Sequence, residues 1–214
     1  MQQLVVFLTN SFGDRLAFVG LQGSYMRGEA TEESDIDPMV VIDCLCIDDL
    51  NVYKQIISKM EQPEKSCGFM CGRQDLLRWN PLEICHLLHT TKSYFGCLSE
   101  LVPQSTDADV RNFVKLSVNN LYHEITHRYI HASFEVNSSR ITGSYKSVFF
   151  ILQNVHYLDT GRFITSKAEL LNELNGKDAE IMATAIALQA GDSYEFSQLF
   201  AQLYNWCNHI LERI

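Results

Sequence analysis

Apolar residues change their spacing near the middle of the chain. In the first half, short apolar runs at 16–21, 36–42 and 67–72 predict strands, and residues 1–12 and 48–60 predict helices. From Asp107 onward the spacing is helical, and Gly161, Gly176 and Gly191 separate the later segments. The pattern predicts five helices, at about 107–133, 139–158, 166 onward, 178–189 and 194–214.

These elements predict an α+β protein with two domains. A small mixed β-sheet domain with flanking helices is expected over residues 1–103, and an all-α helical bundle over residues 104–214. The boundary falls in the turn-rich segment 102–107. Residues 82–88 (LEICHLL) are interpreted as a strand, with the start of a helix as the alternative.

The stretch 20–43 carries the candidate chemistry. A Gly23-Ser24 turn follows the first strand, and Asp35 and Asp37 open the second. Residues two apart on a strand share a face, so the two carboxylates are expected together, with Ile36 turned to the core. Paired carboxylates suit Mg²⁺, which also binds substrate phosphates. A glycine permits close backbone approach, and a serine beside it offers a hydroxyl to a phosphate.

Composition narrows the class of partner. The 214 residues have a net charge of −9 and are 46% hydrophobic, which argues against a nucleic-acid binder and fits a nucleotide, a small molecule or a cationic substrate. No apolar run is long enough for a membrane span. Seven cysteines, an odd number without a metal-site spacing, are expected as free thiols of a reducing cytoplasm.

The segment GSYMRGEATEESDID (residues 23–37) resembles the signature of the DNA polymerase β-like nucleotidyltransferase superfamily. Its Arg27-Gly28 step is similar to the stand-alone bacterial branch that includes aminoglycoside and lincosamide nucleotidyltransferases. The resemblance implies that Asp35 and Asp37 bind Mg²⁺, one ion or two, and act in catalysis.

The same resemblance implies a nucleotide-binding set on this segment and an enzyme with ATP or another nucleoside triphosphate as co-substrate. Ser24, with Gly23 and Ser34, would bind the phosphates of the nucleotide. Arg27 would add positive charge there, or would pair with Glu29 or with an acid further along the same loop, Glu32.

A further carboxylate is expected as metal ligand or general base. In the family it often comes from a third strand, which makes Glu83 the first candidate, Asp75 the alternative, and Glu124 a candidate from the helical half. A surface carboxylate or helix cap is the competing interpretation of Glu83.

A stripe of polar residues at helical spacing crosses the first helix of the second half: Asn120, His123, Glu124, His127 and His131. Its HEITH sequence matches the HExxH zinc-protease pattern. His131 lies about 12 Å along the helix from His123 and cannot complete that site, so zinc hydrolysis is disfavoured. Glu124 is instead interpreted as a base or an anchor for a cationic substrate, and a solvated helix face is the alternative.

Residues 159–171 (DTGRFITSKAELL) are similar to the helical domain of aminoglycoside nucleotidyltransferases. That likeness implies that Lys167 reaches the nucleotide phosphates, with Thr165 and Ser166 at the helix start. The alternative is an exposed lysine behind an ordinary helix cap.

Together these features predict an enzyme that transfers a nucleoside monophosphate, AMP from ATP, to a hydroxyl of a small molecule such as an aminoglycoside-like antibiotic, releasing pyrophosphate. The alternatives are an antitoxin-type enzyme that adenylylates a protein, and a nucleotide-binding module without turnover. The expected partners are a nucleoside triphosphate and a hydroxyl-bearing acceptor, with no nucleic acid and no membrane.

Overall fold

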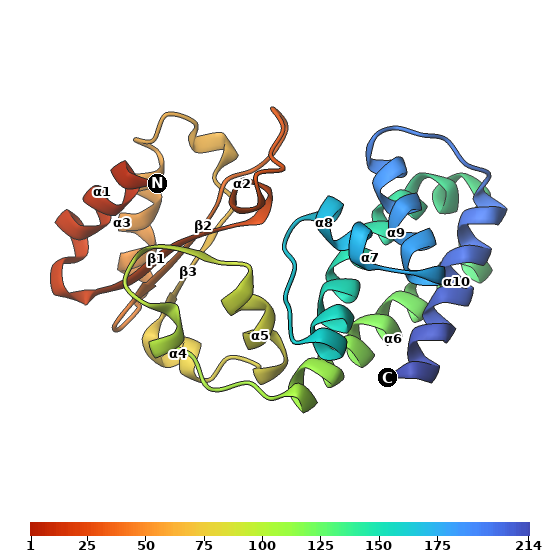
Figure 1. The fold of residues 1–214 in the computed structure, drawn as a ribbon. Coiled ribbons are helices and arrows are strands. Elements are labelled where there is room, and N and C mark those ends of the chain that lie inside the picture. The colour runs from red at the N-terminus through yellow and green to blue at the C-terminus, as the bar shows by residue number, and fades with distance from the viewer. The chain divides into compact units, whose positions relative to one another are not determined.

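The computed structural model describes all 214 residues, and the chain separates into two compact units. The first is Met1–Ser105 and the second is Thr106–Ile214 (Figure 1). The sequence predicts a catalytic domain over residues 1–103 and a substrate-binding or nucleotide-binding helical domain over residues 104–214. These roles of the two parts stay predictions. None of the helices is both long and apolar enough to cross a bilayer.

The first unit contains a four-stranded mixed sheet in the order β3-β2-β1-β4. The strands are β1 (Leu16–Gln22), β2 (Asp37–Ile42), β3 (Phe69–Gly72) and β4 (Lys92–Phe95). β1 pairs antiparallel with both β2 and β4, whereas β2 and β3 are parallel. The helices of this unit are α1 (Gln2–Phe12), α2 (Gly23–Arg27), α3 (Ile47–Ile57), α4 (Arg73–Leu77) and α5 (Pro81–His89), with 3₁₀ turns at Gly13–Arg15, Pro63–Lys65 and Leu98–Glu100.

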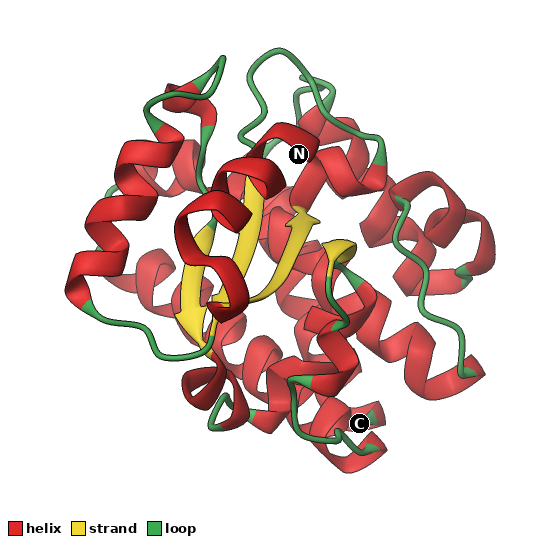
Figure 2. Cartoon of the chain, turned by 90° about the vertical axis from the view of Figure 1, so that its left-hand side faces the viewer, coloured by secondary structure: helices red, strands yellow, loops and turns green.

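Alternation along β2 supplies both faces of the sheet with apolar side chains. Val40 and Ile42 pack in a cluster with Leu4 and Leu8 of α1, and Ile56 of α3 joins them. Met39 and Val41 point the other way, into a second cluster that includes Leu76 of α4. Helices therefore cover the sheet on both sides, and Figure 2 shows the helices that cross its strands.

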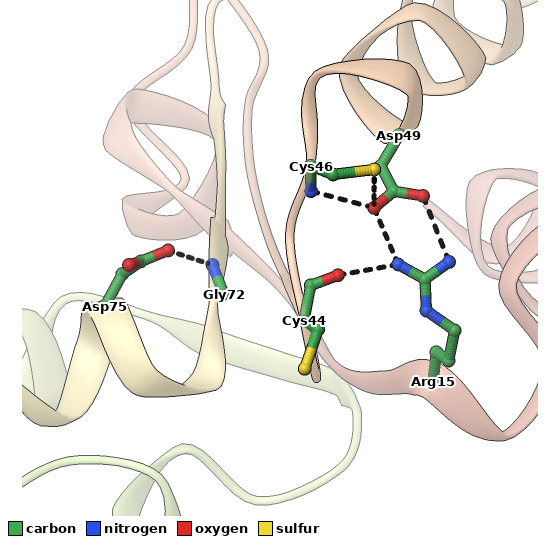
Figure 3. Close-up of polar contacts among 6 residues, drawn as sticks. All are labelled: Arg15, Cys44, Cys46, Asp49, Gly72 and Asp75. Carbon is green, nitrogen blue, oxygen red and sulfur yellow. Dashed lines mark hydrogen bonds and ion pairs between the residues drawn. The ribbon is translucent and has the colours of Figure 1, made fainter.

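Two acid caps fix the helices that follow the parallel strands (Figure 3). Asp49 accepts a hydrogen bond from the Cys46 amide at the start of α3 and two from the Arg15 guanidinium, at 3.1 and 2.6 Å. Asp75 accepts the Gly72 amide at 2.9 Å and so caps α4. Both caps lie where β2 and β3 end, whereas Asp37 lies where β2 begins.

The second unit is a bundle of five helices. They are α6 (Asp107–His131), α7 (Phe134–Thr160), α8 (Lys167–Glu173), α9 (Gly176–Gln189) and α10 (Phe196–Arg213). α7 packs against α6, α9 and α10, and its buried residues include Tyr145, Val148 and Leu152. The hydroxyl of Tyr145 donates to the Leu199 carbonyl of α10 at 2.9 Å.

The fold class expected from the sequence, a mixed sheet with flanking helices followed by helices alone, is confirmed. The strand predicted at 82–88 is wrong: these residues lie in α5, which Asn80 caps and Pro81 begins. β4 has no counterpart among the predicted strands, because all four of its residues are exposed and present no apolar pattern. α7 begins at Phe134, about five residues before its predicted start, because Ser133 caps it there.

Candidate active site

The Gly23-Ser24 turn and the start of β2 lie side by side. In the antiparallel register Gln22, the last residue of β1, pairs with Asp37, so Gly23 comes directly after the paired position. Gly23 has a φ of +68°, and a Cβ built on it would lie 2.0 Å from Asp37 Oδ2. A side chain at residue 23 would be strained by this φ, and its Cβ would displace the Asp37 carboxylate.

Asp35 and Asp37 form a close pair of carboxylates. Asp37 is half-buried at the first position of β2, and Asp35 is exposed two residues before it. Burial raises the pKa of Asp37, the charge of Asp35 raises it further, and the charge of Arg27 opposes both. Two carboxylates that repel each other beside a backbone turn are a donor set that fits a hard divalent cation.

The prediction that Ile36 turns into the core is wrong. Ile36 is only half-buried, and it lines a surface hollow together with Met1 and Pro38. Its amide donates to the Lys65 carbonyl at 2.7 Å, and its own carbonyl accepts the Cys67 amide at 2.9 Å. Ile36 lies two residues before the buried run of β2, which begins at Pro38, so it is at the margin of the sheet, where the core ends.

Arg27 ends α2 and is ion-paired with Glu29, with Nε 3.0 Å from Oε2. Of the two acids expected as its partners, the structure therefore selects Glu29. The Arg27 side chain is only 11% exposed, and its charge acts on both Asp37 and His86. Gly28, with a φ of +72°, ends the helix and lets the chain return toward β2.

His86 is a site residue that sequence reasoning missed. It lies on α5, and its pKa is lowered to about 4, first by burial, then by the charge of Arg27 and by His89. A neutral imidazole therefore lies within electrostatic range of Arg27 at physiological pH. The alternation at 82–88 pointed to a strand and hid this residue, which is three positions from Glu83 on the helix.

The serine expected to bind the nucleotide from the loop, Ser34, has a structural role. Its Oγ accepts the Thr31 amide at 2.9 Å and lies 3.3 Å from the Thr31 hydroxyl. The carbonyl of Ser24 accepts the Glu29 amide at 2.9 Å. The loop between α2 and the aspartates is thus held by its own hydrogen bonds, and Ser24 is half-buried at its base.

The candidates for the third carboxylate in the first unit have hydrogen-bond partners outside the aspartate pair. Glu83 is exposed on α5, not on a strand, and its Oε2 accepts the Trp79 indole N–H at 2.6 Å. Asp75 is the cap of α4. No group of three or more His, Cys, Asp or Glu side chains is arranged to hold a metal ion. The donor set of the site is therefore the pair Asp35 and Asp37.

The other two predicted residues lie in the second unit. Lys167 is the first residue of α8, behind the N-cap Ser166, and its Nζ donates to Gln189 Oε1 at 2.6 Å. Glu124 on α6 is half exposed and accepts from Arg128 Nη1 at 2.5 Å. The roles expected for both stay predictions.

A family model matches part of the first unit. Residues 8–65, which hold the whole turn and aspartate segment, match the nucleotidyltransferase domain family model. No curated protein matches the sequence.

Two solved structures are similar. One is the spectinomycin adenyltransferase AAD(9) from Enterococcus faecialis with ATP and spectinomycin, at 16% identity and a TM-score of 0.58, over 99% of this chain and 97% of that one. The other is a toxin-antitoxin with AMP-PNP, at 18% identity and a TM-score of 0.33, over 61% of this chain and 94% of that one. The first likeness extends the shared fold over both units. The segment 8–65 is therefore similar to nucleotidyltransferase domains, and both units share the fold of this adenyltransferase.

Proposed function

We propose that the chain is a Mg²⁺-dependent enzyme that transfers AMP from ATP to a hydroxyl group of a small molecule and releases pyrophosphate. The observation that carries the proposal is the packing of the Gly23 turn against the Asp35 and Asp37 pair. This packing would bring a serine hydroxyl for the phosphates close to a carboxylate pair for the cation, between two adjacent antiparallel strands.

Asp35 and Asp37 would hold the metal ion, because a divalent cation offsets the burial of the Asp37 charge and its repulsion by Asp35, the two causes that raise the pKa of Asp37. When bound, Mg²⁺ supplies Lewis-acid stabilisation of the charge that develops on the phosphate oxygens. Ser24 binds the phosphates through its hydroxyl, next to the turn at which Gly23 admits the Asp37 carboxylate. Arg27, held by Glu29, supplies a positive charge beside Asp37.

A base must accept the proton of the attacking hydroxyl, and a carboxylate is the side chain of choice at neutral pH. Glu83 and Glu124 are the candidates, and Lys167 is the candidate for a phosphate contact from the second unit. Transfer then depends on positioning and charge neutralisation, without a covalent enzyme intermediate.

The acceptor class is proposed from two observations. The relative with the shared fold binds spectinomycin, an antibiotic with several hydroxyls. The net charge of −9 attracts a cationic acceptor and repels a polyanionic one. Aminoglycoside-like and aminocyclitol-like antibiotics are therefore the first acceptors to screen.

The test is calorimetric titration of ATP and of GTP, with and without Mg²⁺, on the wild type and on Asp37→Asn. Asp43→Asn is the matched control, because it removes the same charge at the opposite end of β2, where Asp43 pairs with Arg73. We expect Mg²⁺-dependent binding in the wild type and the control, and its loss in Asp37→Asn. Undiminished binding in Asp37→Asn would refute the assigned site.

Pyrophosphate release with a panel of acceptors then measures the transfer. Glu83→Gln and Glu124→Gln separate the two candidate bases, since only loss of the true base lowers kcat while nucleotide affinity is kept. Pyrophosphate release with every small molecule absent, together with AMP labelling of a protein, would replace the small-molecule acceptor with a protein one.

A further inference from the structure

Three histidines stand one turn apart on the exposed face of α6, in the second unit. They are His123, His127 and His131, and each is separated from the next by three residues. The ring centroids of His123 and His127 are 5.8 Å apart, and those of His127 and His131 are 4.8 Å apart. The proposed nucleotidyl transfer uses none of these imidazoles.

The spacing of the rings fits chelation of one metal ion by two neighbouring histidines. With metal–nitrogen bonds of about 2 Å, two imidazoles on a tetrahedral ion hold their ring centroids about 5 Å apart. The two measured separations lie on either side of that value, and the pair His127–His131 is the nearer. His123 and His131 are two turns apart, about 12 Å, and cannot share an ion.

The rings border an open hollow of about 550 Å³ between α6 and the start of α7. Water therefore has access to the remaining positions of a bound ion, and only a small rearrangement of exposed side chains is needed. Arg140 borders the same hollow, so its positive charge opposes a cation there. The histidines must be the source of any affinity.

Glu124, the second residue of the HExxH match, is held in an ion pair in this structure and is not assigned as the base of a metalloprotease. Its Oε1 accepts from Arg128 Nη1 at 2.5 Å and from the Ser144 hydroxyl at 3.1 Å. Arg128 Nη2 donates to that same hydroxyl at 2.8 Å. This triad ties α6 to α7 and pairs the carboxylate with a guanidinium, so only metal binding by the histidines is argued for this face.

We propose that His127 forms, with His131 or His123, a two-histidine chelate for one borderline transition-metal ion such as Zn²⁺, Co²⁺ or Ni²⁺. Imidazole nitrogen is a preferred ligand of these ions, whereas Mg²⁺ prefers oxygen. The site is therefore chemically separate from the pair Asp35 and Asp37, and an excess of Mg²⁺ does not compete for it.

The test is titration of the 214-residue chain with Co²⁺ in the presence of a large molar excess of Mg²⁺. Binding is followed by calorimetry and by absorption spectra, for the wild type and for three histidine variants. His127 belongs to both pairs, so His127→Ala is expected to weaken binding at least tenfold. His123→Ala keeps the closer pair and should bind within about threefold of the wild type, with His131→Ala between them. All three side chains are exposed, so the fold tolerates each change.

Exposed thiols, Cys44, Cys46, Cys67 and Cys97, are the competing ligands on this chain. Thiolate ligation of Co²⁺ gives an intense near-ultraviolet charge-transfer band that imidazole ligation does not. Unchanged affinity in His127→Ala, equal losses in His123→Ala and His127→Ala, or a thiolate band in the wild type would each overturn the proposal. Arg140→Gln should tighten binding, because it removes an opposing charge while leaving the ligands in place.

Discussion

Replacing Gly23 by alanine tests the central contact of the site. The change has two separable costs. The backbone at residue 23 has a φ of +68°, a left-handed conformation that costs an L-residue about 1–2 kcal/mol. The added Cβ would also meet Asp37 Oδ2 at 2.0 Å, and the carboxylate must move until the separation reaches ordinary contact.

The magnitude follows from that displacement. Real Cβ contacts are at least 3.0 Å, so the carboxylate oxygen has to shift by at least 3.0 − 2.0 = 1.0 Å. A misplacement of about 1 Å in catalytic geometry costs on the order of 100-fold in rate. We therefore expect kcat/KM for pyrophosphate release to fall about 100-fold in Gly23→Ala, with a matching loss of Mg²⁺-dependent ATP affinity.

Gly28→Ala is the matched control. Gly28 has a φ of +72°, so alanine there meets the same backbone cost, but nothing lies within 4 Å of the added Cβ. Urea denaturation should show both variants destabilised by about 1–2 kcal/mol, and only Gly23→Ala should lose ATP binding by calorimetry. Equal ATP affinity in the two variants would refute the argument that Gly23 exists to admit the Asp37 carboxylate.

Two further predictions concern pH. The pKa of Asp37 is raised by burial and by its charged neighbour, so its contribution favours the fold at acidic pH and is lost as the pH rises through that pKa. Asp37→Asn should therefore make the ligand-free protein more stable than the wild type at pH 7, and a less stable variant in urea denaturation would contradict this. The pKa of Asp49 is lowered to about 2, first by its hydrogen bond from Arg15, so its stabilisation is present above about pH 4 and is lost toward pH 2. Asp49→Asn should flatten that acid loss, measured by urea midpoints between pH 2 and pH 6, and an unchanged slope would exclude the ion pair as its source.

The sequence predicts the turn and the aspartates well because their geometry is local. Fourteen positions separate Gly23 from Asp37, and antiparallel pairing of the two flanking strands brings them together in register. The residue types alone indicate both a glycine at a positive φ and a pair of carboxylates at the start of a strand. The prediction for Ile36 was wrong because the alternation was extended two residues before the buried part of β2, which begins at Pro38.

Features that depend on distant packing escaped prediction. β4 pairs with β1 through its backbone, and its four exposed side chains do not alternate between polar and apolar. At 82–88 the spacing of the apolar residues fits both a strand and a helix. The Asn80 side chain, which accepts a hydrogen bond from the Leu82 amide, favours the helix. The proximity of His86 to Arg27 joins segments that are 59 positions apart and follows only from the folded arrangement.

The helix at 81–89 also changes the charge balance of the site. A strand would have brought the Glu83 carboxylate toward the sheet, but the helix turns it to Trp79 and brings His86 near Arg27 instead. With a pKa of about 4, His86 adds no charge at neutral pH. Asp35, Asp37 and the Arg27 partner Glu29 are then three carboxylates against one guanidinium, which leaves two negative charges. Two is the charge that a single divalent cation neutralises, so the burial that keeps His86 neutral would also maintain the attraction of the proposed site for Mg²⁺.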